Sequence, residues 1–117
     1  MASGRPTVKD TVFVLSPAGR KAVMDGLAKR IWWLPAGKQR RCRALTNEAL
    51  RSLQKGDGRA AIKAVREVQK LVTTEMEKKG GPSGGDKDFT RCVNGCLNRT
   101  RASDWQTQTV CYLVCVL

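Results

Sequence analysis

The 117-residue sequence contains no histidine. Histidine is the side chain that most often serves as a general base near neutral pH and as a metal ligand, so its absence removes both roles. The sequence also lacks a glycine-rich loop before a Lys-Ser or Lys-Thr pair, and it has no pair of carboxylates at close helical spacing in an apolar setting. We therefore expect that the protein is not an enzyme and that it binds no cofactor.

Aromatic residues and long apolar runs are also scarce. Phe, Trp and Tyr make up 5 % of the residues, so a core must consist mostly of Ala, Val, Leu and Ile. No apolar run approaches the roughly 18–20 residues that a membrane-spanning helix needs. The N-terminus lacks the apolar segment of a secretory signal, although it is basic and poor in acids, as organelle transit peptides are. These absences predict an intracellular protein without a transmembrane segment, in the cytoplasm or nucleus in preference to an organelle.

Acidic residues are few, and the excess of basic residues is uneven. The chain has 22 Lys and Arg against 10 Asp and Glu, a formal net charge of +12. Residues 1–47 hold ten basic and two acidic residues, residues 48–80 hold eight and five, and residues 81–117 hold four and three. Such clustered positive charge is typical of nucleic-acid-binding proteins, and also of proteins that bind anionic membranes or acidic proteins.

Turn-forming and helix-breaking residues divide the chain into four parts. The β-branched residues at 8–15 favour a short strand or extended arm within residues 1–15. Ser16 and Pro17 form a good helix start, and the apolar spacing then predicts three helices within residues 16–79. Residues 80–88 predict a flexible linker, and residues 89–117 a cysteine-containing apolar tail. The predicted fold class is mainly α, a small three-helix basic domain with a short N-terminal extended arm and a flexible C-terminal tail.

The second and third predicted helices, at about 38–55 and 58–79, are joined by a Gly-Asp-Gly turn, so we expect antiparallel neighbours. The segment LQKGDGRAAIKAVREVQKL resembles the turn and second helix of a tetratricopeptide repeat, with Ala61 and Ile62 at the repeat's alanine and aliphatic positions. The resemblance covers residues 46–79. It lacks the repeat's usual aromatic positions and closing proline, and the chain has no second copy.

Aromatic and basic residues are most concentrated in the segment 31–43, IWWLPAGKQRRCR. Trp32 and Trp33 would point about 100° apart on a helix, so we expect one to pack in the core and the other to be exposed. Cations neutralise phosphates and flat side chains stack on bases, a combination typical of nucleic-acid surfaces. A solvated helix face with both Trp residues in the core is the alternative interpretation. The candidate nucleic-acid-binding residues are Arg30, Trp32, Trp33, Lys38, Arg40, Arg41, Arg43, Arg59, Lys63 and Arg66.

Four of the five cysteines form two Cys-x3-Cys pairs, Cys92 with Cys96 and Cys111 with Cys115. Two helices bearing such pairs could be joined by two disulfides or could hold one metal ion through four thiolates. The spacing resembles the twin CX3C pattern of small chaperones of the mitochondrial intermembrane space, which implies a redox or metal module. That family has no counterpart of the basic upstream segment. Reduced cysteines packed as small hydrophobic residues are the expected state, without a bound metal.

These features together predict a non-catalytic nucleic-acid-binding protein with limited sequence selectivity, with RNA as a more probable partner than DNA. One alternative is a helical adaptor that docks an acidic protein partner through residues 46–79, and a second is a twin CX3C redox or metal module. The unpaired strand at 8–15 and the apolar tail both favour association, so a homo-oligomer is also expected.

Overall fold

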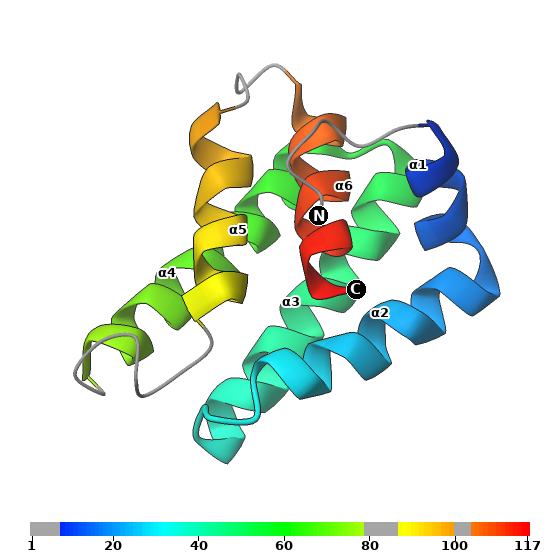
Figure 1. The fold of residues 1–117 in the computed structure, drawn as a ribbon. Helices are drawn as coiled ribbons and strands as arrows, with labels where there is room; N and C mark the ends of the chain where they lie inside the picture. Colours follow the sequence, from blue (N-terminus) through cyan, green and yellow to red (C-terminus); the bar gives the residue numbers. More distant parts are fainter. Residues whose placement is uncertain (1–7, 79–86, 100–103) are drawn as a thin grey trace.

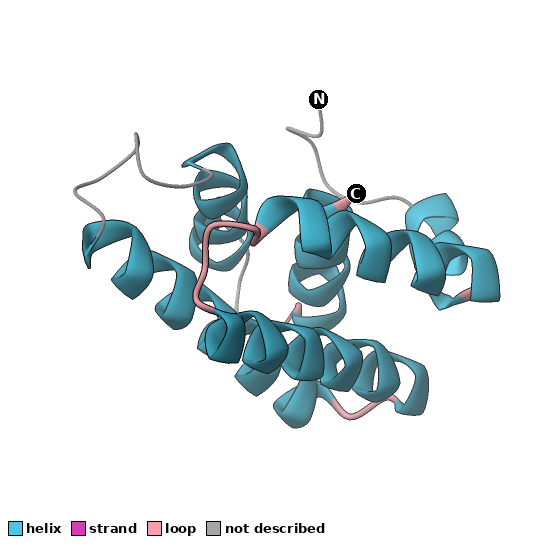
Figure 2. Ribbon diagram, turned by 90° about the horizontal axis from the view of Figure 1, so that it is seen from below, coloured by secondary structure: helices cyan, strands magenta, loops and turns pink. Residues whose placement is uncertain are grey.

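This computed structural model describes residues 8–78, 87–99 and 104–117. Most of these residues belong to six helices (Figure 1). In chain order they are α1 (Val8–Leu15), α2 (Pro17–Arg30), α3 (Ala36–Lys55), α4 (Gly58–Lys78), α5 (Lys87–Arg99) and α6 (Trp105–Val116). The described residues contain no strand, and the loops among them are short (Figure 2). The predicted mainly α class is therefore confirmed. The three helices expected within residues 16–79 correspond to α2, α3 and α4, whereas α1, α5 and α6 were not predicted. None of the described helices is long and apolar enough to cross a membrane.

The helix boundaries between Ser16 and Ala60 follow local signals in the sequence. The Ser16 hydroxyl accepts a hydrogen bond of 3.0 Å from the Gly19 amide and caps α2. Gly56 has a φ of 81°, the left-handed conformation that ends helix α3 without steric strain. The Asp57 carboxylate then accepts a hydrogen bond of 3.1 Å from the Ala60 amide and caps α4. The short connection makes α3 and α4 close neighbours along the chain and in space, as the sequence predicts (Figure 1).

Residues 8–15 form helix α1, so the predicted strand or extended arm is wrong over this stretch. Residues 1–7 of that predicted arm lie outside the described residues. A strand needs a partner for its backbone groups and the described residues offer none, whereas a helix pairs these groups internally. The turn between α1 and α2 is tight. A β-carbon at Gly19 would lie 1.6 Å from the Phe13 carbonyl oxygen, so only glycine allows this approach.

The predicted flexible tail, residues 89–117, contains most of α5 and all of α6, so that prediction is also wrong. Helix α6 contacts each of the other five helices and runs through the middle of the molecule (Figure 1). Its C-terminal run VCYLVCVL is apolar on every side, and a helix that is apolar all round is buried on all sides. The predicted linker, residues 80–88, lies mostly outside the described residues, and its last two residues already belong to α5.

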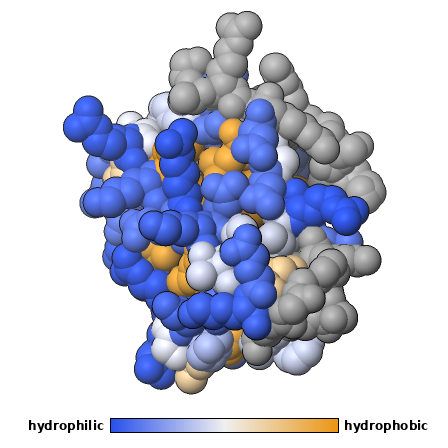
Figure 3. All heavy atoms as spheres, turned by 90° about the vertical axis from the view of Figure 1, so that its left-hand side faces the viewer, coloured by the Kyte–Doolittle hydropathy of each residue, from blue (hydrophilic) through white to orange (hydrophobic). Residues whose placement is uncertain are grey.

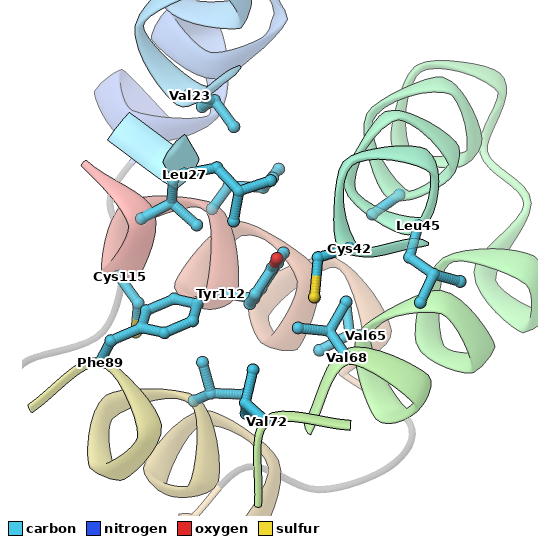
Figure 4. Packing of buried hydrophobic residues seen from close by; sticks show 14 of the residues in the cluster. Val23, Leu27, Cys42, Leu45, Val65, Val68, Val72, Phe89, Tyr112 and Cys115 are labelled. Atoms are coloured by element: carbon cyan, nitrogen blue, oxygen red, sulfur yellow. The ribbon is translucent and has the colours of Figure 1, made fainter. Parts of the chain in front are cut away.

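All six helices contribute to one hydrophobic core, so the basic helices are not stabilised by one another alone. Tyr112 of α6 lies at its centre (Figure 4). The Tyr112 hydroxyl lies 2.7 Å from the Thr46 hydroxyl, which donates to the Cys42 carbonyl oxygen at 2.8 Å. Because the single Thr46 proton is used in that bond, Tyr112 must be the donor to Thr46. Self-association was predicted from an unpaired strand at 8–15 and from the apolar tail. Residues 8–15 are helical and most of the tail is buried in α6, so self-association stays a prediction.

Candidate nucleic-acid interface

The turn between α2 and α3 buries three of its apolar side chains and exposes the fourth. Ile31, Trp33 and Leu34 are buried, whereas the Trp32 side chain is 70 % exposed. The Trp33 indole donates a hydrogen bond of 2.8 Å to the Arg30 carbonyl oxygen, which satisfies its polar atom inside the core. The prediction that one tryptophan packs and the other faces water is therefore confirmed.

A glutamine of α3 fixes the backbone on which Trp32 is presented. The Gln39 side-chain amide donates to the Leu34 carbonyl oxygen at 2.8 Å and to the Trp32 carbonyl oxygen at 3.3 Å. The first turns of α3 are thereby held against the turn that carries Trp32. The cations on either side of Gln39, Lys38 and Arg40, are both exposed. An exposed indole thus precedes the end of α3 that carries the exposed side chains of Lys38 and Arg40.

Helix α4 carries a row of cations on the side opposite its buried stripe. Arg59, Lys63, Arg66 and Lys70 recur at steps of three and four residues, and all four are exposed. At a rise of 1.5 Å per residue the row is about 17 Å long. Figure 3 views the molecule from the side of α4 and α5, where hydrophilic side chains cover most of the visible surface and apolar atoms show only between them.

Two glutamates of α3 and α4 form ion pairs with nearby arginines, and most other cations of these two helices have no ion-pair partner among the described residues. Glu67 pairs with Arg41 at 2.8 Å, and Glu48 pairs with Arg51 at 2.9 Å. The hydrogen bond from Arg51 lowers the pKa of the Glu48 carboxyl group below its usual value. Besides Lys55 at the C-terminal end of α3, seven exposed cations of α3 and α4 make no ion pair with any described residue, and we call these seven the cationic surface. They are Lys38, Arg40, Arg43, Arg59, Lys63, Arg66 and Lys70.

A shallow groove of about 390 Å³ runs between α3 and α4. Arg41, Arg51 and Lys63 contribute cationic side chains to its lining, and the two paired glutamates Glu48 and Glu67 contribute the acidic ones. The groove therefore combines apolar alanine and leucine side chains with charges of both signs. Of the seven cations of the cationic surface, Lys63 lines the groove and the other six do not.

The structure divides the ten predicted binding residues into three groups. Six of them belong to the cationic surface, and Trp32 is exposed beside it. Trp33 is in the core, and Arg41 is held by Glu67, so these two residues do not offer free groups to a ligand. Arg30 is partly exposed, and its carbonyl oxygen accepts the Trp33 bond. Lys70 was not among the predicted residues, although the three- and four-residue repeat on α4 extends to it.

The four cysteines of the C-terminal part were expected to be reduced, and this expectation is wrong. Cys92 is joined to Cys115 and Cys96 to Cys111, with Cα–Cα distances of 5.9 and 5.7 Å. The i, i+4 spacing places each pair on one helix face, so α5 and α6 meet as an antiparallel hairpin with nested crosslinks. The sequence left open disulfides or a metal site. The sulfurs of Cys92, Cys96 and Cys115 do lie within 4.8 Å of one another, but as disulfides they offer no thiolate ligand.

The fifth cysteine, Cys42, is a free thiol in the core near Tyr112 (Figure 4). Burial raises its pKa to about 11, so the thiol keeps its proton at neutral pH and is a poor nucleophile. Burial also raises the pKa of Tyr112. Both side chains therefore act as uncharged core residues.

Comparison with protein-family models, curated proteins and solved structures finds no match. The resemblances of residues 46–79 to a tetratricopeptide repeat and of the cysteine spacing to twin CX3C proteins thus stay hypotheses.

Proposed function

We propose that the protein is a non-catalytic nucleic-acid-binding protein that holds phosphate groups on the cationic surface of α3 and α4. The observation that carries the proposal is the set of seven exposed cations without a carboxylate partner among the described residues. Like charges held this close repel one another, and a polyanion relieves that repulsion. Each contact with a phosphate also releases condensed counterions, which is the main source of affinity in such complexes.

Limited sequence selectivity is expected because the proposed contacts are between cationic side chains and phosphates. Phosphate contacts fix the position of a nucleic acid but carry no sequence information, which is read from base edges. The cationic surface consists of lysine and arginine on two convex helix ridges, with no asparagine or glutamine among its seven members. RNA and DNA present the same phosphates to this surface, so the predicted preference for RNA is a separate question for experiment.

The test is the binding of a fluorescently labelled RNA and DNA to the oxidised protein. Replacement of Arg59, Lys63 and Arg66 by alanine is expected to weaken binding at least tenfold. A matched control replaces three exposed cations of other helices, Lys9→Ala, Lys21→Ala and Arg91→Ala, and has the same net charge as the test variant. Equal losses of affinity in the two variants would show that net charge alone drives binding, and would contradict a specific role of α4. If the parent protein binds no nucleic acid at low salt, the proposal is rejected, and an acidic protein partner becomes the better account.

A redox module is a second candidate function, and the nested disulfides of α5 and α6 are the observation in its favour. Disulfides persist in oxidising compartments and are rare in the cytosol and nucleus. The predicted cytoplasmic or nuclear location is therefore in tension with these bonds, and we propose an oxidising compartment. Intact mass under native extraction decides the redox state, because two disulfides lower the mass by four hydrogens.

A further inference from the structure

We propose that the nucleic acid is single-stranded and that one of its unpaired bases stacks on Trp32. This inference rests on the proposed function, since it names which nucleic acid the cationic surface takes. A duplex keeps its base faces stacked inside, whereas a single strand can turn a base outward onto an aromatic ring. The indole of Trp32 is the large aromatic surface that the interface offers to such a base.

The exposure of Trp32 is built into the turn and is not a result of loose packing. Its neighbours Ile31 and Trp33 are anchored in the core, and the Gln39 amide holds the Trp32 carbonyl oxygen at 3.3 Å. The backbone of Trp32 is therefore fixed before any ligand arrives. A rigid aromatic side chain loses little conformational entropy on binding, which favours its use as a contact residue.

Exposed cations follow Trp32 within a few residues along the chain, at the start of α3. Gln39 contacts the Trp32 backbone, and its neighbours Lys38 and Arg40 are exposed members of the cationic surface. Arg43 continues the exposed side of α3 one turn further on. Lys38 lies about 200° around α3 from Arg40, on the other side of the helix, whereas Arg40 and Arg43 share one side. A strand with one base on Trp32 can thus continue along α3 with its phosphates against Arg40 and Arg43. An arginine at such a position also stacks on bases, which strengthens the preference for unpaired ones.

The experiment measures the affinity of the oxidised full chain for three probes of equal charge. They are a single-stranded RNA, the DNA strand of the same sequence, and polyphosphate, which has no bases. A duplex of the same sequence is the fourth probe. The Trp32→Ala variant is expected to bind both single strands about 5- to 150-fold more weakly and to bind polyphosphate and duplex within twofold of the parent. The Trp32→Phe variant keeps a stacking ring and should recover most of the affinity for single strands.

Intrinsic fluorescence gives an independent readout, because an exposed indole is quenched when a base stacks on it. Saturating single-stranded RNA should quench the parent protein, and Trp32→Phe should lose that quenching although it still binds. The remaining emission would come from Trp33 and Trp105.

The outcomes separate the two proposals. If Trp32→Ala binds single strands as the parent does, or weakens all four probes equally, the stacking inference is wrong while nucleic-acid binding stands. If the parent prefers the duplex, the inference is also wrong. If the Arg59, Lys63 and Arg66 variant binds every probe like the parent, the proposed function itself fails.

Discussion

The two helical hairpins of the molecule, α3–α4 and α5–α6, use their side chains in opposite ways. The α3–α4 pair buries one apolar stripe and turns seven unpaired cations toward water. The α5–α6 pair is crosslinked by two disulfides and supplies the helix that touches all the others. The crosslinks therefore lie in α5–α6 and the unpaired cations in α3–α4. Because its side chains are exposed, we expect that the cationic surface can be altered without loss of the fold, and that the fold is more sensitive to changes in the crosslinked hairpin.

Reduction of the disulfides is expected to have the largest effect on stability. A disulfide that closes a loop of about 15 residues stabilises a protein by about 3 kcal/mol, mainly by constraining the unfolded chain. The loop between Cys96 and Cys111 has this length, with a sequence separation of 15. Urea unfolding followed by circular dichroism, with and without reductant, measures the change.

A variant with serine in place of Cys92, Cys96, Cys111 and Cys115 is the control, because reductant should not change its stability. A parent protein whose unfolding midpoint is insensitive to reductant would contradict the structural role given to α5–α6.

Substitution of Gly19 by alanine is expected to cause the next largest loss of stability. The new β-carbon would meet the Phe13 carbonyl oxygen, a backbone atom that cannot move aside, so we expect a loss of about 1–3 kcal/mol. Gly37 is the matched control in the first turn of α3. The nearest atom to its β-carbon is 3.9 Å away, so Gly37→Ala should leave stability unchanged or raise it by up to about 1 kcal/mol. Similar effects at both positions would argue against the close packing of α1 on α2.

Loss of the hydrogen bond between Tyr112 and Thr46 should give an effect of similar size or smaller. Thr46→Val leaves the buried Tyr112 hydroxyl without its acceptor, which costs about 1–3 kcal/mol. Tyr112→Phe removes the donor and should cost about 1 kcal/mol. The double variant should lose less than the sum of the two single losses, because no orphaned hydroxyl remains. Additive losses in urea unfolding would mean that the two hydroxyl groups do not interact.

The smallest effect on stability is expected from the cationic surface. Its side chains are exposed and unpaired among the described residues, so each alanine substitution should change the free energy of unfolding by no more than about 0.5 kcal/mol. The variant lacking Arg59, Lys63 and Arg66 should therefore unfold at nearly the same urea concentration as the parent. A large loss of stability would show that these residues have structural partners.

Local signals in the sequence predicted the middle of the molecule well. The cap at Ser16, the Gly56-Asp57 turn and the apolar stripes of α3 and α4 act within a few residues of chain, so they can be read from the sequence directly. The split between Trp32 and Trp33 was predicted from helical geometry, although both residues lie in the turn between α2 and α3. The unpaired cations on α4 also follow from a regular repeat in the sequence, which runs from Arg59 to Lys70.

The first and last parts of the chain were predicted poorly because tertiary contacts determine them. The β-branched residues of α1 have only a weak intrinsic preference for strands, and contact with α2 and α6 overrides it. The run VCYLVCVL has no polar face, so periodicity could not tell a buried helix from an exposed tail. The spacing of the cysteines allowed two disulfides, but only the packing of α5 on α6 brings the sulfurs together.

The most direct test of nucleic-acid binding by the cationic surface is the salt dependence of single-stranded RNA affinity. The logarithm of the binding constant should fall linearly with the logarithm of salt concentration, with a slope of about −0.7 per phosphate contacted. Removing Arg59, Lys63 and Arg66 should make the slope less steep by up to about 2, whereas the variant lacking Lys9, Lys21 and Arg91 should keep the parent slope. Equal slopes for all three proteins would contradict the assignment of phosphate binding to α3 and α4.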